Sequence, residues 1–108
     1  MGKFVIKPAK NGEYFFNLKA DNGQTILTSE MYTTKAACQK GVESVRKHSQ
    51  MDKMFETKKT ASGKFHFNLK ASNGQVIGSS EQYEAEAGMK NGIESVKKNG
   101  STANIVEE

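Results

Sequence analysis

Alternating apolar and polar residues mark two stretches of the chain as strands. From Phe65 to Ala71 every second residue is apolar, and the residues between them are polar. The stretch from Tyr14 to Ala20 has the same alternation, with Phe15 at one of the polar positions. Because successive side chains of a strand point to opposite faces, each stretch predicts a strand with one face in the core and the other in solvent.

An Asn-Gly pair and a second apolar run follow each of these strands and predict a β-hairpin. We expect a three-residue turn that ends in the glycine, held in the left-handed conformation. This turn sets Leu18 opposite Ile26 and Leu69 opposite Ile77, so both hairpins make the same core pair. A two-residue turn would set Leu18 opposite Leu27 but Leu69 opposite a glycine.

Helical periodicity follows each hairpin. Apolar or small residues recur at i, i+3, i+4 and i+7, starting from Cys38 in the first half and from Met89 in the second. Thr33 is a suitable N-cap for the first of these helices. Gly41 and Gly92 lie on the apolar faces, where a glycine costs about 1 kcal/mol relative to alanine. We therefore expect each helix to lie unusually close to the sheet at its glycine.

The whole pattern occurs twice, 51 residues apart, with Phe16 matching Phe67 and Tyr32 matching Tyr83. A single domain, residues 1–108, is expected, made of two tandem β-β-β-α-β units at about 1–52 and 53–108. The fold class is α+β: one mainly antiparallel sheet with two helices on one face and a pseudo-twofold axis. Residues 53–59 align with both the opening strand and the closing segment "ANIVEE". We therefore expect a shared strand there, with the terminal strands exchanged between the units.

A family resemblance rests on the repeated residues. The pattern is Phe-x-Leu-Lys-Ala, Asn-Gly-Gln, Ile and Ser-Glu-x-Tyr, followed by a helix with Gly-Val/Ile-Glu-Ser-Val-Lys/Arg. It resembles the YegP-like family of small uncharacterised bacterial domains, in its duplicated form, over nearly the whole chain. The resemblance implies two strand-strand-strand-helix-strand units that share one sheet. It implies no established activity and no catalytic or binding residues.

Composition and charge narrow the class of protein. The 108 residues are 35% hydrophobic and 26% charged, which is typical of a soluble globular domain, and no apolar run could span a membrane. Cys38 is the single cysteine, which excludes an internal disulfide and favours a reducing compartment. We expect a cytoplasmic monomer. The net charge of +4 comes from 16 basic and 12 acidic residues, and it permits weak attraction to polyanions.

Candidate catalytic chemistry is sparse. Cys38 lies on an apolar helical face, so we expect a buried core thiol rather than a nucleophile. His48 and His66 occupy positions where the other half has Asn99 and Phe15, so we expect surface histidines. Cysteine and histidine residues with metal-binding spacing are absent from the sequence, and we expect no metal and no cofactor. The two Ser-Glu pairs that start at Ser29 and Ser80 have no histidine placed to serve as a base for both. We therefore expect a protein that is not an enzyme.

With catalytic patterns excluded, a binding function is the broadest class of function that remains. If the helices cover one face of the sheet, the other face is open and presents mixed basic, amide and aromatic groups. The expected residues of this face are Phe15, Asn17, Lys19, Lys64, His66, Asn68 and Lys70. Such a face could bind a protein or an anionic partner, and the alternative function is weak binding of RNA or another single-stranded nucleic acid. The competing interpretation is an ordinary solvated sheet face.

Overall fold

The computed structural model describes residues 2–108. Strands and helices alternate along the chain in two similar series, each of three strands and a helix, and a last strand follows the second helix. The elements are β1 (Lys3–Pro8), β2 (Tyr14–Lys19), β3 (Thr25–Ser29), α1 (Lys35–His48), a short 3-10 helix (Asp52–Met54), β4 (Phe55–Lys59), β5 (Phe65–Lys70), β6 (Val76–Ser79), α2 (Glu86–Gly100) and β7 (Asn104–Glu107). The fold class is α+β, as expected.

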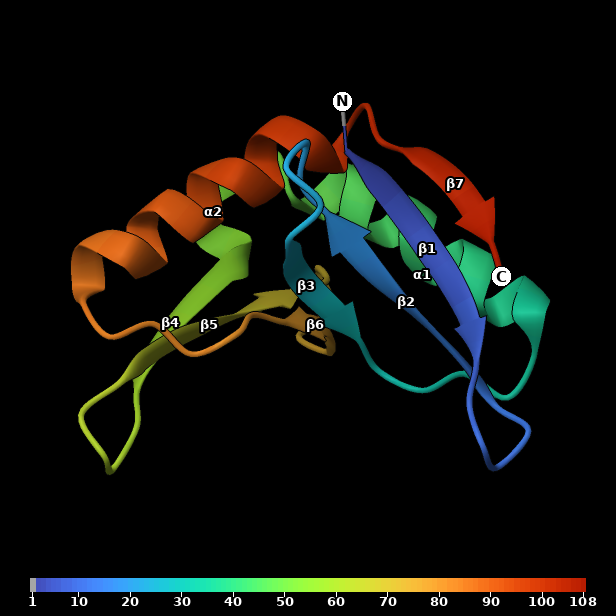
Figure 1. Cartoon of the computed structure of the whole chain (residues 1–108), viewed down its shortest axis with the longest axis horizontal. Coiled ribbons are helices and arrows are strands. Elements are labelled where there is room, and N and C mark those ends of the chain that lie inside the picture. Colours follow the sequence, from blue (N-terminus) through green and yellow to red (C-terminus); the bar gives the residue numbers. More distant parts are fainter. Residues whose placement is uncertain (1) are drawn as a thin grey trace.

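The seven strands of the described residues belong to one sheet, in the order β4-β5-β6-β3-β2-β1-β7. Every neighbouring pair is antiparallel except β1 and β7, which are parallel. The sheet is therefore mixed and mainly antiparallel. The two halves meet where β3 pairs with β6, and β7 lies beside β1 at the edge of the first half (Figure 1).

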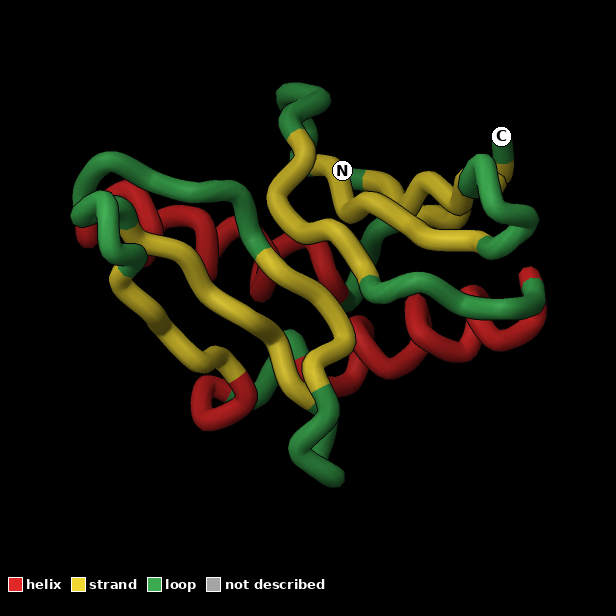
Figure 2. The backbone as a smooth tube through the Cα atoms, turned by 90° about the horizontal axis from the view of Figure 1, so that it is seen from below, coloured by secondary structure: helices red, strands yellow, loops and turns green. Residues whose placement is uncertain are grey.

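Both helices pack on the same face of this sheet. Leu18 pairs with Leu27, and Gly78 pairs with both Ser29 and Leu69, so these positions share one face across the four central strands. This face carries the core: Leu18, Leu27 and Leu69 are completely buried. In Figure 1, α1 lies behind β1 and β2, and in Figure 2 a helix runs below the strands near the C-terminus. The opposite face has no helix over it within residues 2–108.

The hairpin turns have the predicted length, but the predicted register was wrong. Ala20 N–H donates to the carbonyl of Gln24 at 2.9 Å, which leaves a three-residue loop, and Gly23 has a φ of 85°. A bulge follows, however, and Leu18 pairs with Leu27 instead of Ile26. Because the bulge adds one residue to β3, Ile26 and Leu27 both enter the core. The second hairpin has the corresponding bulge, and Leu69 pairs with Gly78.

The helix glycines lie against tyrosine rings. A Cβ at Gly41 would overlap the Tyr32 hydroxyl and lie 2.6 Å from its Cζ. A Cβ at Gly92 would overlap the hydroxyl of Tyr83 in the same way. The sequence predicted that each helix approaches the sheet at its glycine. The closest contact is instead with the tyrosine that precedes the helix, and the strand residues Phe16 and Phe67 lie next, at 3.1 and 3.3 Å from the two Cβ positions. The N-cap of α1 is Thr34 rather than Thr33, and its side chain accepts a hydrogen bond from the Ala37 N–H.

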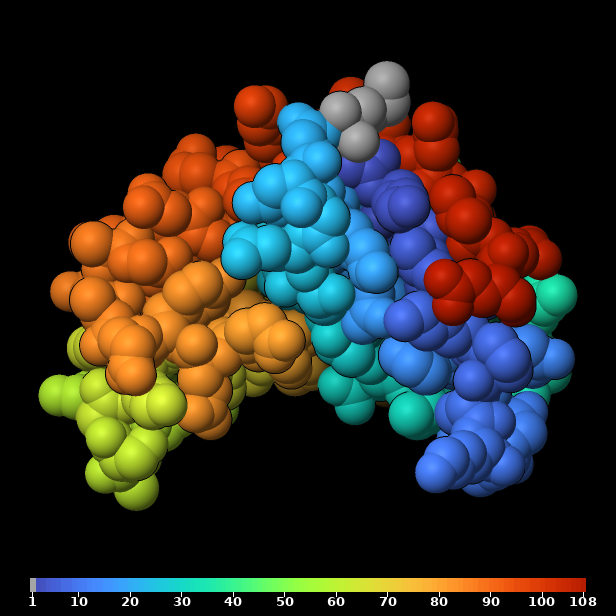
Figure 3. Space-filling view, in the orientation of Figure 1, coloured from blue at the N-terminus to red at the C-terminus, as the bar shows by residue number. Residues whose placement is uncertain are grey.

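The junction between the halves differs from the shared strand that the sequence predicts. Residues 53 and 54 belong to the 3-10 helix, and β4 begins only at Phe55. Among residues 2–108, β4 pairs with β5 alone, so it lies at one edge of the sheet and makes no ladder with the first three strands. The β1–β2 and β4–β5 turns project from the same side of the molecule, with a hollow between them (Figure 3).

Candidate binding face of the sheet

One row of paired residues crosses the helix-free face from edge to edge. Pairing joins Val5 to Asn17, Asn17 to Thr28, Thr28 to Ser79, Ser79 to Asn68 and Asn68 to Glu56. Directly paired residues of a sheet project from the same face, so this row fixes which side chains the open face presents.

The two amides in this row are held by their neighbours. Asn17 Nδ2 donates to Thr28 Oγ1 at 3.0 Å, and Ser79 Oγ donates to Asn68 Oδ1 at 2.7 Å. Asn17 is only 8% exposed. The middle of the face is therefore a polar but largely satisfied strip, and the groups free to meet a partner lie on both sides of it.

Lysines surround the strip. The register places Lys3, Lys7, Lys19, Lys58 and Lys70 on the open face, and Lys64 precedes β5 with the same alternation. Glu56 is the one carboxylate at these paired positions within residues 2–108. Three of the lysines, Lys3, Lys7 and Lys19, make no ion pair within the described part of the chain. The first half of the face is therefore distinctly basic.

Charge on the second half of the face is partly neutralised. Lys70 Nζ lies 3.0 Å from Glu56 Oε2, and Lys58 Nζ lies 3.7 Å from Glu56 Oε1. The hydrogen bond from Lys70 lowers the pKa of the Glu56 carboxyl below its ordinary value, so this carboxylate stays charged. Lys64 faces Glu84 at 3.6 Å.

The seven residues expected on the open face all have the alternation that places them there. Phe15, Asn17 and Lys19 lie on β2, and His66, Asn68 and Lys70 lie on β5. Two strands, β3 and β6, separate the groups. Phe15 pairs with Lys7, is half-buried, and is the one Phe or Tyr at the paired positions of this face within residues 2–108. Sequence reasoning missed Lys3 and Lys7, because the alternation of β1 is hidden by its apolar run Phe4–Ile6.

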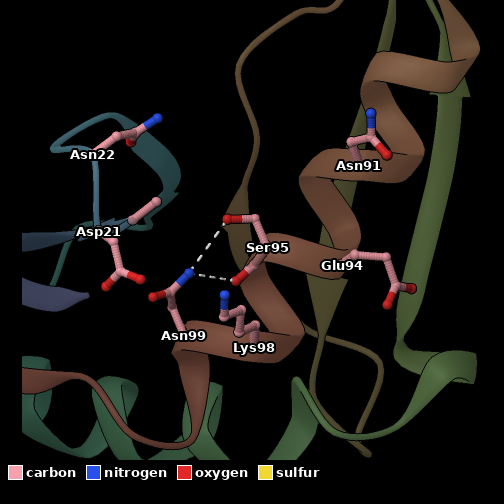
Figure 4. Close-up of a pocket in the computed structure, with 8 residues that line it drawn as sticks. Asp21, Asn22, Asn91, Glu94, Ser95, Lys98 and Asn99 are labelled. Atoms are coloured by element: carbon pink, nitrogen blue, oxygen red, sulfur yellow. Dashed lines mark hydrogen bonds between the residues drawn. The ribbon is translucent and has the colours of Figure 1, made fainter. Parts of the chain in front are cut away.

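A second candidate is an open pocket of about 330 Å³ between the β2–β3 turn and α2. Figure 4 shows the polar groups around it, among them Asp21, Glu94 and Lys98. Asn99 Nδ2 donates to the Ser95 carbonyl at 2.8 Å and approaches Ser95 Oγ at 3.3 Å. The lining residues include no histidine, so the imidazole that usually activates a serine nucleophile is missing beside Ser95.

In the other half, His48 stands at the position that corresponds to Asn99. This histidine was predicted on the surface, and the prediction was wrong, since only 6% of it is exposed. Its Nε2 accepts a hydrogen bond from the Ser72 N–H at 3.1 Å, which leaves Nδ1 to donate to the Ser44 carbonyl at 2.8 Å. His48 thus joins the end of α1 to the β5–β6 turn. The other histidine, His66, is half-buried on the helix-free face, and its sequence position fits the expected polar strand face.

The repeated Ser-Glu pairs serve the backbone. Ser29 Oγ accepts from the Phe16 N–H at 2.8 Å and donates to the Glu30 carbonyl at 2.8 Å. Ser80 makes the same two bonds, with the Phe67 N–H and the Glu81 carbonyl. Both hydroxyls are therefore committed to strand hydrogen bonding, and the recurrence of serine 51 residues apart was the signal for this structural role.

Cys38 is completely buried in the core, as predicted. Burial raises the pKa of its thiol and so disfavours the reactive thiolate. Within residues 2–108, no three His, Cys, Asp or Glu side chains are grouped to hold a metal ion. No helix in the same range is long and apolar enough to cross a membrane.

Comparison with known proteins places this geometry among bacterial proteins of unknown function. The model of a family described as a domain of unknown function, DUF1508, matches the chain twice, over residues 9–56 and 61–107. A UPF0339 protein of Photorhabdus laumondii is 53% identical over 97% of this chain and 92% of its own length. A UPF0339 protein of Pseudomonas aeruginosa is 50% identical over 98% of this chain and 96% of its own.

Two solved structures have the same fold. The solution NMR structure of YegP from Escherichia coli, a protein of unknown function, superimposes with a TM-score of 0.94 at 44% identity, covering 99% of this chain and 92% of that one. A UPF0339 protein of Shewanella oneidensis superimposes with a TM-score of 0.93 at 40% identity, covering 98% of this chain and 90% of that one.

Proposed function

Because the chain belongs to the DUF1508 family, whose UPF0339 members are uncharacterised, we propose from its own geometry that it is a non-enzymatic binding module. The binding surface is the helix-free face of the sheet, and its ligands are anionic. The observation that carries this proposal is the set of lysines on that face, Lys3, Lys7 and Lys19, that have no acidic partner among residues 2–108.

The absence of enzymatic activity is part of the proposal. Three observations support it: the Ser29 and Ser80 hydroxyls are used by the backbone, the Cys38 thiol is buried, and both ring nitrogens of His48 have partners. A nucleophile needs an adjacent base and an open approach. The single buried thiol also fits a protein of the reducing cytoplasm, which is where we place it, as a monomer.

The proposal also takes the chain to be a duplication of one β-β-β-α-β unit with a pseudo-twofold axis. In support, the family model matches two segments, and β1–β2 and β4–β5 pair in the same register, Ile6 with Phe16 and Thr57 with Phe67. β7 follows the second helix in sequence but pairs with β1 of the first half, as an exchanged terminal strand would.

Single-stranded RNA is the anionic ligand that the face favours. Phe15 lies directly beside Lys7 and Asn17, so a base could stack on the ring while the lysines neutralise flanking phosphates. Lysines that neutralise phosphates release counterions. The logarithm of the binding constant then falls linearly with the logarithm of the salt concentration, with a slope of about −0.7 per neutralised phosphate of a single strand.

The test is an anisotropy titration of labelled single-stranded RNA with the full-length protein at several salt concentrations. We expect Lys3→Glu with Lys19→Glu to weaken binding at least tenfold, because these two residues face each other across β1 and β2. Phe15→Ala is expected to cost about 1–3 kcal/mol of binding free energy. Lys70 is left unchanged, since its replacement would break the ion pair with Glu56.

The matched control is Lys40→Glu with Lys47→Glu, which changes the net charge equally on the exposed surface of α1. Equal losses from both double variants would mean diffuse attraction without a site. Failure to bind at low salt would overturn RNA as the ligand and leave an acidic protein surface as the partner of this face.

A further inference from the structure

The two halves of the sheet end differently. β7 covers the outer edge of β1, with Ile6 paired to Glu107 and the Glu108 N–H donating to the Ile6 carbonyl at 3.0 Å. Side chains of α1 hold the end of this strand. Lys35 Nζ lies 3.2 Å from Glu107 Oε1, and Gln39 Nε2 donates to Glu107 Oε2 at 3.1 Å. The edge of β1 and the flank of α1 together form a slot that an acidic strand fills.

The outer edge of β4 is the corresponding edge of the second half. β4 has β5 on one side, and no strand within residues 2–108 lies on its other side. The Phe67 N–H donates to Ser80 Oγ, on the side of β5 that faces away from β4. Thr57 and Phe67 lie opposite each other on β4 and β5, and they are therefore a pair without backbone hydrogen bonds between them. The N–H and carbonyl of Thr57 therefore point outward, as the carbonyl of Ile6 does toward β7.

The backbone N–H and carbonyl of Lys59 point outward for the same reason. Its partner Phe65 bonds through both backbone groups to Tyr83, on the far side from β4. Lys59 stands where the first half has Pro8, which has no N–H to offer. Pro8 therefore offers no N–H to a strand beside β1, whereas Lys59 offers one at the edge of β4. At the other end the edge is closed, because the Phe55 N–H already donates to the Asp52 carbonyl.

A hollow of about 230 Å³ lies beside this free edge. It is lined by Thr57, Lys58, Lys59, Phe65, Glu86 and Met89. Thr57 and Glu86 occupy the positions that Ile6 and Lys35 have in the first half, where they meet the end of β7. β7 covers Ile6, which is 1% exposed, whereas no strand of the described residues covers Thr57, which is exposed. The space that the end of β7 fills in one half is thus empty in the other.

Charge around the hollow selects the occupant. Lys58 and Lys59 of its lining are exposed. Lys90 on α2 is exposed as well, and it stands in the repeat where Gln39 binds Glu107 in the first half. Lys59 and Lys90 make no ion pair within the described residues, and Glu86 is the one carboxylate of the lining. An acidic chain gains from these lysines, and a basic chain is repelled by them.

We propose that the outer edge of β4 and the adjoining flank of α2 bind an extended acidic peptide segment of another protein. The segment adds to the sheet as an eighth strand, parallel to β4, and pairs with the backbone of Thr57 and Lys59. An acidic side chain near its end meets Lys90. This interface is separate from the helix-free face and is independent of any RNA binding there.

The experiment uses the full-length protein and a labelled peptide with the sequence of residues 102–108, Thr-Ala-Asn-Ile-Val-Glu-Glu, as the probe. Anisotropy measures its affinity, and amide chemical shifts locate it. We expect shifts at residues 57–59 and 86–90. A peptide in which both glutamates are replaced by lysine is expected to bind at least fivefold more weakly.

Two variants test the mode of binding. Thr57→Pro removes the outward N–H while sparing the pairing with β5, and it is expected to weaken binding at least tenfold. Should that variant fail to fold, Lys59→Glu tests the charge, with Lys10→Glu in the distant β1–β2 turn as the matched control. Absence of binding at about 1 mM peptide would overturn the proposal. So would shifts confined to residues 4–6, which would show exchange with the chain's own β7.

Discussion

The side chain of Leu27 fills the space beside Gly78. A Cβ at position 78 would lie 2.8 Å from both Cγ and Cδ2 of Leu27, closer than carbon atoms pack. The two positions correspond in the repeat, 51 residues apart, and they meet on the strands β3 and β6 that join the halves. The first half thus supplies a large side chain, and the second half has a glycine that leaves room for it.

This contact makes Gly78 sensitive to any added side chain. Gly78→Ala is expected to lower the free energy of unfolding by about 1–3 kcal/mol through overpacking, although alanine suits a strand better than glycine does. Urea denaturation of the variant measures the loss. In the double variant with Leu27→Ala, the loss due to alanine at position 78 should largely disappear, since its methyl group then has room. Equal losses in both backgrounds would contradict direct contact.

The helix glycines are expected to resist substitution for a similar reason. Gly41→Leu and Gly92→Leu should each cost about 1–3 kcal/mol or more, because the new side chain meets Tyr32 or Tyr83. Gly88 is the matched control in α2, since a Cβ there would lie at an ordinary 3.5 Å from the nearest atom, which belongs to Tyr83. Gly88→Ala should be neutral or raise the melting temperature. Leucine variants at 41 and 92 that melt like the parent would show that these glycines are merely tolerated.

Replacement of His48 tests its role as a buried link. His48→Ala leaves the Ser72 N–H without its acceptor, and we expect a loss of about 1–3 kcal/mol in thermal or urea unfolding. Asn99→Ala is the comparison in the other half, where the lost bond is the one to the Ser95 carbonyl. If His48→Ala proved as stable as the parent, the hydrogen bonds around the imidazole would contribute nothing net.

Alkaline pH should destabilise the fold through Cys38. Burial raises the pKa of its thiol above the ordinary 9.0, so the unfolded chain loses this proton first as the pH rises. The stability linked to the thiol is complete below pH 9 and is lost above it. Urea denaturation between pH 7 and about 10.5 should show the free energy of unfolding decline with pH. In the Cys38→Ala variant, the part of this decline that begins near pH 9 should disappear. Burial also raises the pKa values of Tyr32 and Tyr83, so a later decline should remain in that variant.

Much of the fold follows from patterns of short range. The alternation around Phe67 and the periodicity from Cys38 gave the strand and helix faces, and the Asn-Gly pairs gave three-residue turns, because each depends on residues a few positions apart. The placement of the open-face residues on β2 and β5 followed from the same alternation. The basic residues Lys3 and Lys7 did not, since β1 carries Val5 on that face, where alternation predicts a polar residue.

The sequence alone determined the repeat, the order of strands and helices and the left-handed glycine of each hairpin, since these depend on local preferences and period. Tertiary structure decided the packing of Leu27 against Gly78, the burial of His48 and the place of β7 beside β1. Each of these depends on what a distant segment offers. Gly78 leaves the space that the Leu27 side chain fills, and β7 pairs with the outer edge of β1. No local pattern encodes either contact.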